Sequence, residues 1–402
     1  MIHFQPTGHI YIHLPFCRSR CSYCSFASVA VAAVPEKAYF EALVAEFEDR
    51  LKSWPQALLP LVTLYFGGGT PSLFSPSVYS HLIDLFAEKI GFCDDPEITL
   101  EANPADVSRE KISGYKAAGI NRISLGAQTF APEGLQLLGR RHDGALVEKA
   151  VNLLRQGGID NLSLDLIYAW PGQSLTLLLE DLRKLEALAP EHISAYSLSL
   201  EPGTRLSQAV TAGELSVPSE DIQAEMMQLV GESLDDAGIY RYEISNFARS
   251  DHLQAQHNLA YWHLNDYLGL GAGACGGWCC RKNDHYWAER YCNMPDPFAY
   301  MQRISQLNSF LSVAGNRFES WFEIEVIDRK TSFTEALMMG LRLRQGVALV
   351  PLQAEYGLQL VDTLMSRAEK FRIEGLIDWD ENNLWITDKG LFLGDTILSF
   401  LL

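Results

Sequence analysis

Short apolar runs alternate with longer amphipathic segments through the first half of the chain. Six runs rich in β-branched and aromatic residues are each followed by a segment whose apolar residues recur with helical periodicity. The predicted strands are His9–Leu14, Leu61–Phe66, Glu97–Glu101, Arg122–Gly126, Asn161–Ile167 and His192–Ser199. The predicted helices are Glu36–Lys52, Pro76–Ile90, Ser108–Ala118, Gly144–Gln156, Ser174–Ala187 and Ser219–Asp236. This alternation predicts a parallel sheet wrapped by helices.

Six strand–helix pairs are two short of a full (β/α)8 barrel. The sequence therefore predicts an α/β fold built on a partial (β/α)6 TIM-type barrel that is open on one side, although an open doubly wound sheet remains possible. In such barrels the chemistry lies at the carboxyl ends of the strands. The unusual residues of this chain fall at those ends: three cysteines after the first strand, three glycines after the second, and then Glu101, Gln128 and Asp165.

The sequence predicts a barrel domain of residues 1–240 and two further parts in the second half of the chain. Residues 241–320 are rich in His, Trp, Tyr, Cys and Gly and poor in periodicity, which predicts a cap. Residues 321–402 carry helical patterns at Phe333–Arg344 and Val361–Gly375, a strand-turn-strand pattern at Leu376–Ile386 and a final helix, an order that resembles a winged-helix α+β domain. Residues 331–402 contain six Lys or Arg and ten Asp or Glu, so this domain is not expected to bind DNA.

Composition narrows the class of protein. The 402 residues are 48% hydrophobic, which is enough for a large core, and 32 Lys and Arg against 50 Asp and Glu argue against a nucleic-acid binder. Met1–Leu14 lacks the features of a secretory signal, and no apolar run is long enough to cross a membrane. A cytoplasmic protein is expected, and its eight cysteines are then expected to serve metal binding or catalysis rather than a disulfide framework.

The strongest chemical signal is Cys17-x3-Cys21-x2-Cys24, which follows the first predicted strand. Three thiolates within eight residues can hold three irons of a [4Fe-4S] cluster and leave the fourth iron open. An open iron can chelate S-adenosylmethionine (SAM), and an electron from the cluster can cleave its carbon–sulfur bond to give a 5′-deoxyadenosyl radical. The alternative is half of a zinc site or a structural thiol pair, but the next cysteine is Cys93.

Several polar or glycine-rich positions at the strand ends could bind SAM. The run Gly67-Gly68-Gly69-Thr70-Pro71 would let backbone groups approach a ligand, although it could be only a tight turn. Glu101, Gln128 and Asp165 could hydrogen-bond a ribose. Arg140 could neutralise a carboxylate, with Arg141 competing for that role. Each could instead be a satisfied core polar group or a surface cation.

Two clusters fall in the predicted cap. His257-Asn258-Leu259-Ala260-Tyr261-Trp262 could bind heme, with His257 on the iron and Tyr261 and Trp262 against the porphyrin. It could equally be an aromatic corner that packs the cap on the barrel. Cys275, Cys279, Cys280 and Cys292 lie within 18 residues, which is enough for zinc or an auxiliary cluster, although free cysteines are often simply buried.

The stretch from His9 through Cys24 resembles the start of the HemN/HemW family of radical SAM proteins, the oxygen-independent coproporphyrinogen III oxidases and their relatives. The similarity continues at Gly67–Pro71, Glu101–Pro104, Ser124–Gln128, Gly139–His142 and Asp165–Tyr168. By this resemblance Cys17, Cys21 and Cys24 hold the cluster. The residues implied to line the SAM site are Tyr11, Tyr23, Gly68, Gly69, Thr70, Glu101, Gln128, Arg140, Asp165 and Gly273.

The resemblance also favours one branch of the family. True coproporphyrinogen oxidases carry a further cysteine two places after the third cluster ligand, where this chain has Phe26. The motif His257-Asn258-x-x-Tyr261-Trp262 is similar to that of HemW-type heme chaperones, in which it is associated with heme binding. One departure is Cys275, where such chaperones usually have histidine, so a thiolate could replace an imidazole near the cofactor.

The implied function is that of a heme chaperone, which binds heme as cargo and delivers it to apo-proteins such as respiratory enzymes. An electron donor such as flavodoxin or ferredoxin is implied as a partner, together with transient membrane association through partners and no nucleic acid. The alternative is a radical enzyme acting on a porphyrin, by oxidative decarboxylation of coproporphyrinogen III, methyl transfer or ring opening. A zinc-dependent binding protein is the third possibility.

Overall fold

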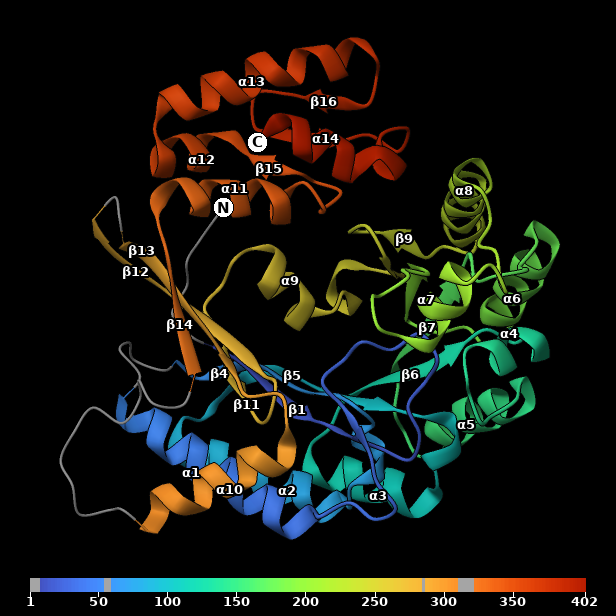
Figure 1. Ribbon diagram of the computed structural model, residues 1–402, viewed down its shortest axis with the longest axis vertical. Coiled ribbons are helices and arrows are strands. Elements are labelled where there is room, and N and C mark those ends of the chain that lie inside the picture. The colour runs from blue at the N-terminus through green and yellow to red at the C-terminus, as the bar shows by residue number, and fades with distance from the viewer. Residues whose placement is uncertain (1–7, 54–58, 284–285, 310–321) are drawn as a thin grey trace.

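A curved sheet of nine strands forms the centre of the computed structural model, which describes the chain except residues 1–7, 54–58, 284–285 and 310–321 (Figure 1). Six parallel strands make up most of it: β1 (His9–Leu14), β4 (Leu61–Gly68), β5 (Phe92–Ala102), β6 (Arg122–Gln128), β7 (Asn161–Tyr168) and β8 (His192–Ser197). β11 (Leu268–Leu270) adds to β1, while β10 (Asn246–Ala248) and β9 (Tyr240–Arg241) add antiparallel beyond β8. Within the described chain β11 and β9 are the two edges and do not pair, so the predicted partial barrel is confirmed.

Helices cover the outside of this barrel (Figure 1). They are α1 (Glu36–Ser53), α2 (Pro76–Lys89), α3 (Arg109–Ala118), α5 (Gly144–Gln156), α6 (Leu175–Ala187) and α8 (Glu220–Asp236). Each end lies within one residue of its predicted position. Ser108, Asp143, Ser174 and Ser219 explain four of the starts, because each side chain accepts a backbone N–H of the first turn. The short helices α4 (Pro132–Leu137) and α7 (Arg205–Thr211) were not predicted.

Alternation along the strands makes the inside of the barrel polar. Side chains such as Ile123, Leu125, Leu162 and Leu164 are buried in the core that joins the sheet to the helices. The residues between them line an internal cavity instead, and they come into register across the sheet: Tyr65 beside Thr99 beside Arg122, and Glu101 beside Ser124 beside Ser163 beside His192. The barrel is therefore a hydrophobic shell around a polar interior.

The expected cap contributes more regular structure than its sequence predicts. It contains part of β9, then β10, β11, the helix α9 (Gln256–Trp262) and the strands β12 (Cys275–Asn283) and β13 (Tyr286–Asn293). The third strand of this second sheet, β14 (Phe322–Ile327), lies beyond the predicted boundary at residue 320 and pairs with β13, so the sheet joins the predicted cap to the predicted C-terminal domain. Helix α10 (Pro297–Ser309) returns to pack beside α1 (Figure 1). A further pair of two-residue strands, β2 (Phe16–Cys17) and β3 (Val29–Ala30), brackets the loop that carries the three cysteines.

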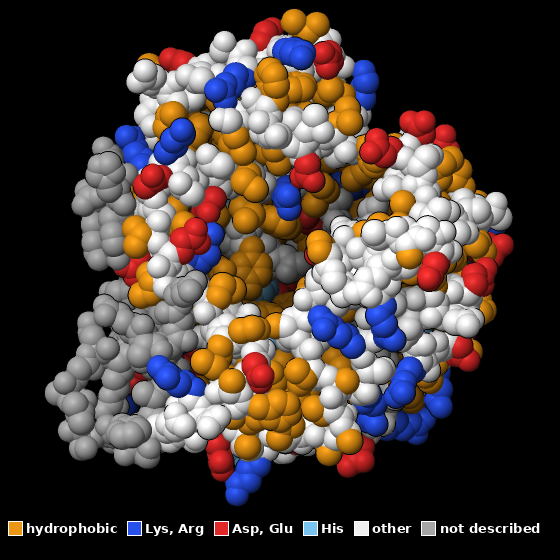
Figure 2. All heavy atoms as spheres, in the orientation of Figure 1, with side chains coloured by type: hydrophobic (Ala, Val, Ile, Leu, Met, Phe, Trp, Pro, Cys, Tyr) orange, Lys and Arg blue, Asp and Glu red, His pale blue; other side chains and the backbone are white. Residues whose placement is uncertain are grey.

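A separate α+β unit ends the chain and lies above the barrel in Figure 1. Its elements are α11 (Arg329–Gly340), β15 (Val347–Ala348), α12 (Leu349–Tyr356), α13 (Leu358–Ile373), β16 (Ile377–Trp379), β17 (Asn383–Ile386) and α14 (Gly394–Leu401). They enclose a core of their own, and the predicted hairpin is present with β15 as a third strand. Figure 2 shows the surface hollowed between this unit and the barrel. No helix among the described residues is long and apolar enough to span a membrane.

Candidate functional site

The interior of the barrel holds a cavity of about 530 Å³. It is lined by residues of all six parallel strands except β1 and by the loops at their carboxyl ends. Eleven of the residues expected in the cluster and SAM sites line it: Cys17, Cys21, Tyr23, Cys24, Gly68, Gly69, Thr70, Glu101, Gln128, Arg140 and Asp165. Tyr11, Gly273, His257, Tyr261 and Trp262 are not among its lining residues.

The cysteine loop is fastened to the barrel at several points. The backbone N–H of Ser22 donates to Leu138 O at 3.2 Å, and its hydroxyl donates to Leu137 O at 2.6 Å. Gly139 has a φ of 73°, and a Cβ there would lie 3.2 Å from the nitrogen of Ser22. A residue with a side chain at 139 would be strained, so this glycine allows the loop to lie close against the end of α4.

Polar groups of the protein already point at the three sulfurs. The hydroxyl of Thr70 donates to Cys17 Sγ at 3.4 Å, and Arg140 Nη1 donates to Cys21 Sγ at 3.7 Å. A backbone N–H of Phe26 is hydrogen-bonded to Cys24. Burial is the largest cause of the raised pKa of the Cys17 and Cys24 thiols. Three thiols on one cavity-facing loop, each with a donor at its sulfur, fit an iron–sulfur cluster.

The three cysteines do not form a site for a single metal ion. In the described part of the chain, no three His, Cys, Asp or Glu side chains are placed to hold a single metal ion. The thiolates of a cubane bind three different irons, so they surround a volume rather than a point. The arrangement of Cys17, Cys21 and Cys24 is consistent with that donor set.

The glycine run joins the second strand to the cysteine loop. Gly69 N–H donates to Leu14 O at 2.9 Å and Thr70 N–H to Phe16 O at 2.9 Å. A Cβ on Gly69 would lie 2.8 Å from the carbonyl oxygen of Phe16, and one on Gly68 would lie 2.6 Å from the ring of His13. The missing side chains therefore let β4 approach the start of the cysteine loop, which brings Thr70 to Cys17.

Two carboxyl groups face the cavity from neighbouring parts of the sheet. Glu101 accepts from the Tyr65 hydroxyl at 2.9 Å and from Gly68 N–H at 3.1 Å. Burial nevertheless raises the pKa of Glu101 to about 7. Asp165 accepts from the Ser124 hydroxyl at 2.8 Å, and burial also raises its pKa. Both groups can accept hydrogen bonds from ligand hydroxyls, and the cost of their burial falls when a ligand supplies donors or positive charge.

Gln128 and Arg140 meet at Gly126 of β6, which pairs with Asp165 of β7. The pairing of β6 with β7 slips by one residue between Gly126 and Gln128, and Gln128 has a φ of 69°. This bulge turns the amide toward the interior, where a Cβ on Gly126 would lie 2.8 Å from Gln128 Nε2. Arg140 Nη2 donates to Gly126 O at 2.9 Å, while its buried Nε has no hydrogen-bond partner among the described residues. Arg141 is exposed at the rim.

Tyr11 and Gly273 are not among the residues that line the cavity. The Tyr11 hydroxyl is 2.9 Å from His13 Nδ1, and the other ring nitrogen of His13 is 2.8 Å from Ala27 O. Gly273 has a φ of 78°, and a Cβ there would lie 2.7 Å from Ala27. In this structure Tyr11, through His13, and Gly273 both lie next to Ala27 of the cysteine loop, which differs from the direct SAM contact implied by the resemblance.

His257 is 1% exposed and has no free ring nitrogen. Its Nδ1 is 2.7 Å from the Thr63 hydroxyl and its Nε2 is 2.9 Å from the Tyr261 hydroxyl. The ring stacks on Tyr65 at 5.0 Å, and burial lowers its pKa well below the usual value. An iron ligand needs a free nitrogen, so the expected heme-ligating role does not fit this structure, and the alternative of an aromatic packing corner does.

The other members of this motif face different neighbours. Trp262 lies at the contact with the C-terminal unit, where the guanidinium of Arg342 is 5.8 Å from its ring. Asn258 lines the barrel cavity, which the sequence analysis did not predict. The motif therefore closes the amino-terminal end of the barrel, since Glu97 at the base of β5 accepts the backbone N–H groups of Gln256 and His257.

Sequence reasoning also missed the polar inner wall of the cavity. Its members are Thr99, Arg122, Ser124, Ser163, His192 and Ser194. His192 is 2.8 Å from both the Ser163 hydroxyl and the Tyr242 hydroxyl, and Arg122 donates to Asn161 and to Leu253 O. The signal was a polar residue at every second position of buried strands, as in Ser163 and Asp165 of β7.

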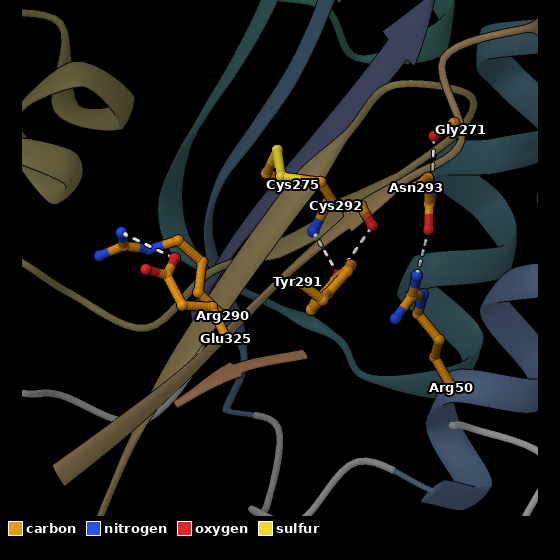
Figure 3. Close-up of a disulfide and its surroundings, with 9 residues drawn as sticks. Arg50, Gly271, Cys275, Arg290, Tyr291, Cys292, Asn293 and Glu325 are labelled. Atoms are coloured by element: carbon orange, nitrogen blue, oxygen red, sulfur yellow. Dashed lines mark hydrogen bonds and ion pairs between the residues drawn. A yellow bond between two sulfur atoms is a disulfide. The ribbon is translucent and has the colours of Figure 1, made fainter. Parts of the chain in front are cut away.

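Cys275 and Cys292 form a disulfide, which corrects two expectations (Figure 3). They lie directly opposite each other on the antiparallel strands β12 and β13. Neither sulfur can act as a thiolate ligand while it is paired, so the four-cysteine metal site and the replacement of an imidazole by Cys275 do not fit. Figure 3 shows Tyr291 near the disulfide. The Tyr291 hydroxyl accepts from the backbone N–H of Gly269 and donates to its carbonyl oxygen. Cys279 and Cys280 remain thiols.

Comparison with family models divides the chain in the same way. Residues 11–201 match the radical SAM superfamily, and residues 327–393 match the HemN C-terminal domain. These matches agree with the barrel and with the α+β unit at the end of the chain.

Similar proteins cover almost the whole chain. A heme chaperone HemW of Lactococcus lactis is 33% identical over 395 residues, which is 98% of this chain and 97% of the relative. A heme chaperone HemW of Haemophilus influenzae is 39% identical over 67% of this chain and 70% of its own length. A mitochondrial radical S-adenosyl methionine domain-containing protein 1 of Mus musculus is 33% identical over 98% of this chain and 87% of its own. The solved structure of Escherichia coli coproporphyrinogen III oxidase, HemN, is similar in fold, with a TM-score of 0.79 at 22% identity over 100% of this chain and 91% of that one.

Proposed function

This chain belongs to the HemW family of radical SAM proteins, and on that premise we propose that it binds heme and transfers it to apo-proteins such as respiratory enzymes. The observation that carries the proposal is the likeness to heme chaperones along nearly the full chain. The partial barrel supports it with an internal cavity whose lining matches a cluster and SAM site. Heme is the cargo of this function and not a resident cofactor.

Membership of the radical SAM superfamily implies a [4Fe-4S] cluster and SAM. Cys17, Cys21 and Cys24 would hold three irons of the cluster and leave the fourth for the amino and carboxylate groups of SAM. When bound, the pair supplies one-electron cleavage of a carbon–sulfur bond. An electron donor such as flavodoxin or ferredoxin is part of the proposal.

The residues of the chain would bind and orient SAM rather than react with it. Arg140 offers the unpaired Nε to a carboxylate, and Gln128 is turned inward by the bulge in β6. Glu101 and Asp165 can accept hydrogen bonds from ribose hydroxyls, and their negative charge would face the sulfonium cation. Tyr23, Gly68, Gly69 and Thr70 close the cavity on the side of the cysteines.

Two experiments test the function. Anaerobically reconstituted protein is titrated with heme, and a Soret band distinct from that of free heme is expected, followed by loss of that band as an added heme-free cytochrome gains it. The same protein is incubated with SAM, reductant and coproporphyrinogen III, and no protoporphyrinogen is expected. Formation of protoporphyrinogen would instead favour a radical enzyme acting on the porphyrin. That result would run against the expectation from Phe26, which stands where the oxidases carry a further cysteine.

A further inference from the structure

We infer that His192 is a positioning residue for the SAM site, because it links Tyr242 of the cap to Asp165 through a chain of hydrogen bonds that orients the Asp165 carboxylate. This inference rests on the proposed SAM binding at Asp165. His192 is 1% exposed and acts through its neighbours rather than by contact with the ligand. The observation that carries the inference is a continuous line of polar side chains across two strands and the cap.

The first part of the chain crosses the pair of strands β7 and β8. Ser163 of β7 lies opposite His192 of β8, and two residues further along Asp165 lies opposite Ser194. His192 Nδ1 is 2.8 Å from the Ser163 hydroxyl, which is 3.4 Å from the Ser194 hydroxyl. Ser194 is in turn hydrogen-bonded to the Asp165 carboxylate. Alternate residues of paired strands share one face of the sheet, which brings these four side chains into one line.

The far end of the chain is the hydroxyl of Tyr242. It lies 2.8 Å from His192 Nε2 and accepts the backbone N–H of Ala255 at 3.1 Å. The backbone of Tyr242 is fixed as well: its N–H donates to Asn246 O at 3.1 Å, and its carbonyl oxygen accepts from Arg344 N–H of the C-terminal unit at 3.0 Å. The cap and the C-terminal unit together hold this hydroxyl in place, although Tyr242 is not among the residues that line the cavity.

The hydrogen atoms of the chain can point in only one direction while Asp165 is ionised. A carboxylate only accepts, so the hydroxyl hydrogen of Ser194 points to Asp165 and Ser194 must accept from Ser163. Ser163 has then used its own hydrogen and must accept from His192 Nδ1–H. Burial lowers the pKa of His192 well below its usual value, so the ring carries one hydrogen and Nε2 accepts from the tyrosine hydroxyl.

This direction determines how Asp165 is held. The Ser124 hydroxyl of β6 donates to Asp165 at 2.8 Å, so serine donors from both neighbouring strands fix the carboxylate and leave its other lone pairs for a ligand. Without the hydrogen from His192 Nδ1, Ser163 can turn its own hydrogen away from Ser194. One of the two serine donors then loses its defined direction, and the carboxylate loses its fixed orientation toward the ribose of SAM.

The experiment measures SAM binding by equilibrium dialysis of the full-length, cluster-loaded protein with labelled SAM. His192→Phe keeps a ring but removes both hydrogen bonds, and it is expected to weaken SAM binding roughly three- to tenfold. Tyr242→Phe removes only the hydroxyl at the far end, and it should weaken binding by a smaller factor. His192→Asn carries an amide N–H near the place of Nδ1 that can donate to Ser163, so it should bind SAM more tightly than His192→Phe.

Matched controls remove similar groups outside the chain. His9→Phe removes a buried imidazole from β1, and Tyr115→Phe removes a buried hydroxyl from α3. Both should bind SAM as the unaltered protein does. Iron content is measured for every variant, so that a loss of SAM binding is not a loss of the cluster.

A second background separates positioning from a general loss of structure. In Asp165→Asn protein the chain no longer ends on a charged acceptor, so His192→Phe should weaken SAM binding no further, whereas a structural loss would still add. If the unaltered protein binds no SAM, the proposed function fails and this inference falls with it. If it binds SAM and His192→Phe binds SAM equally well, or if the effects of His192→Phe and Asp165→Asn simply add, the positioning role alone is overturned.

Discussion

Replacing Glu101 with glutamine should change how the stability of the protein depends on pH. Glu101 lies inside the barrel, and burial raises its pKa from 4.5 to about 7. The pKa is raised even though Tyr65 and Gly68 donate hydrogen bonds to the carboxylate. A carboxyl whose pKa is raised by folding stabilises the folded state fully below its unfolded pKa. That contribution is lost as the pH rises through the folded pKa.

The size of the effect follows from these two values. With a pKa of 4.5 in the unfolded chain and about 7 in the folded chain, the linkage relation gives a loss of about 2.5 kcal/mol between pH 5 and pH 8. Glutamine has no charge to bury, so Glu101→Gln lacks this loss. A constant offset is also expected, because Tyr65 and Gly68 donate to different oxygens of Glu101 and glutamine has an NH2 group in place of one of them, but that offset does not vary with pH.

The assay is urea unfolding of the cluster-free protein and of Glu101→Gln at several pH values, followed by circular dichroism. From pH 5 to pH 8, the unfolding free energy of Glu101→Gln should rise by roughly 2 to 3 kcal/mol relative to that of the unaltered protein. Glu133→Gln, at an exposed position of α4, is the control and should show no such shift. Burial also raises the pKa of Glu243 to about 7. Glu243 is present in the unaltered protein and in both variants, so its contribution to the unfolding free energy cancels in the comparison. Parallel pH profiles for the unaltered protein and Glu101→Gln would refute the reasoning.

Three further substitutions test other parts of the site. Gly69→Ala places a Cβ against the Phe16 backbone, so it should cost about 1–3 kcal/mol in unfolding experiments and lower the iron bound per chain. Cys275→Ser with Cys292→Ser should lower stability by about 3 kcal/mol, a difference that disappears when both proteins are melted in reductant. His257→Phe should cost about 1–3 kcal/mol, because the Tyr261 hydroxyl loses its partner while Thr63 keeps its hydrogen bond to His9, yet leave the heme titration curve unchanged.

The barrel could be predicted from the sequence because its signals are local. Each strand is a short run of buried apolar residues, and each helix has apolar residues at the spacing of one helical face. The sequence pattern alone therefore shows that the helices pack against one sheet. The boundaries were accurate where a capping side chain marks them, as Ser108 and Asp143 do. Helices of six or seven residues, such as α4 and α9, span fewer than two turns, which is too short for the apolar period to repeat and be recognised.

The secondary structure from Tyr240 to Tyr300 could not be predicted, for a different reason. Strands β9, β10 and β11 have two or three residues each, and they exist because β8 and β1 offer edges to pair with. Such pairing is non-local, and a segment of three residues carries no period that could reveal it. The same holds for the disulfide, since Cys275 and Cys292 become neighbours only through the hairpin of β12 and β13.

The candidate site was predictable where function leaves residues outside the ordinary pattern. Three signals stood out: cysteines in a loop, a run of glycines and a carboxylate at a strand end. Such residues reduce stability unless a ligand uses them, and members of all three groups line the cavity. Serines and threonines in strands are ordinary, so Thr99 and Ser163 gave no warning that the strands enclose a polar interior.

Accessibility is the property that residue type cannot supply. His257 has the side chain of an iron ligand, but Thr63 and Tyr261 occupy both of its ring nitrogens, and burial holds its pKa well below the usual value. Phe26 has an unremarkable side chain, yet it is exposed beside the cluster loop with unpaired arginines near it. A binding residue must be able to exchange water for its ligand, and by that criterion Phe26 qualifies and His257 does not. The sequence shows which side chains are present, and only the fold shows which of them a ligand can reach.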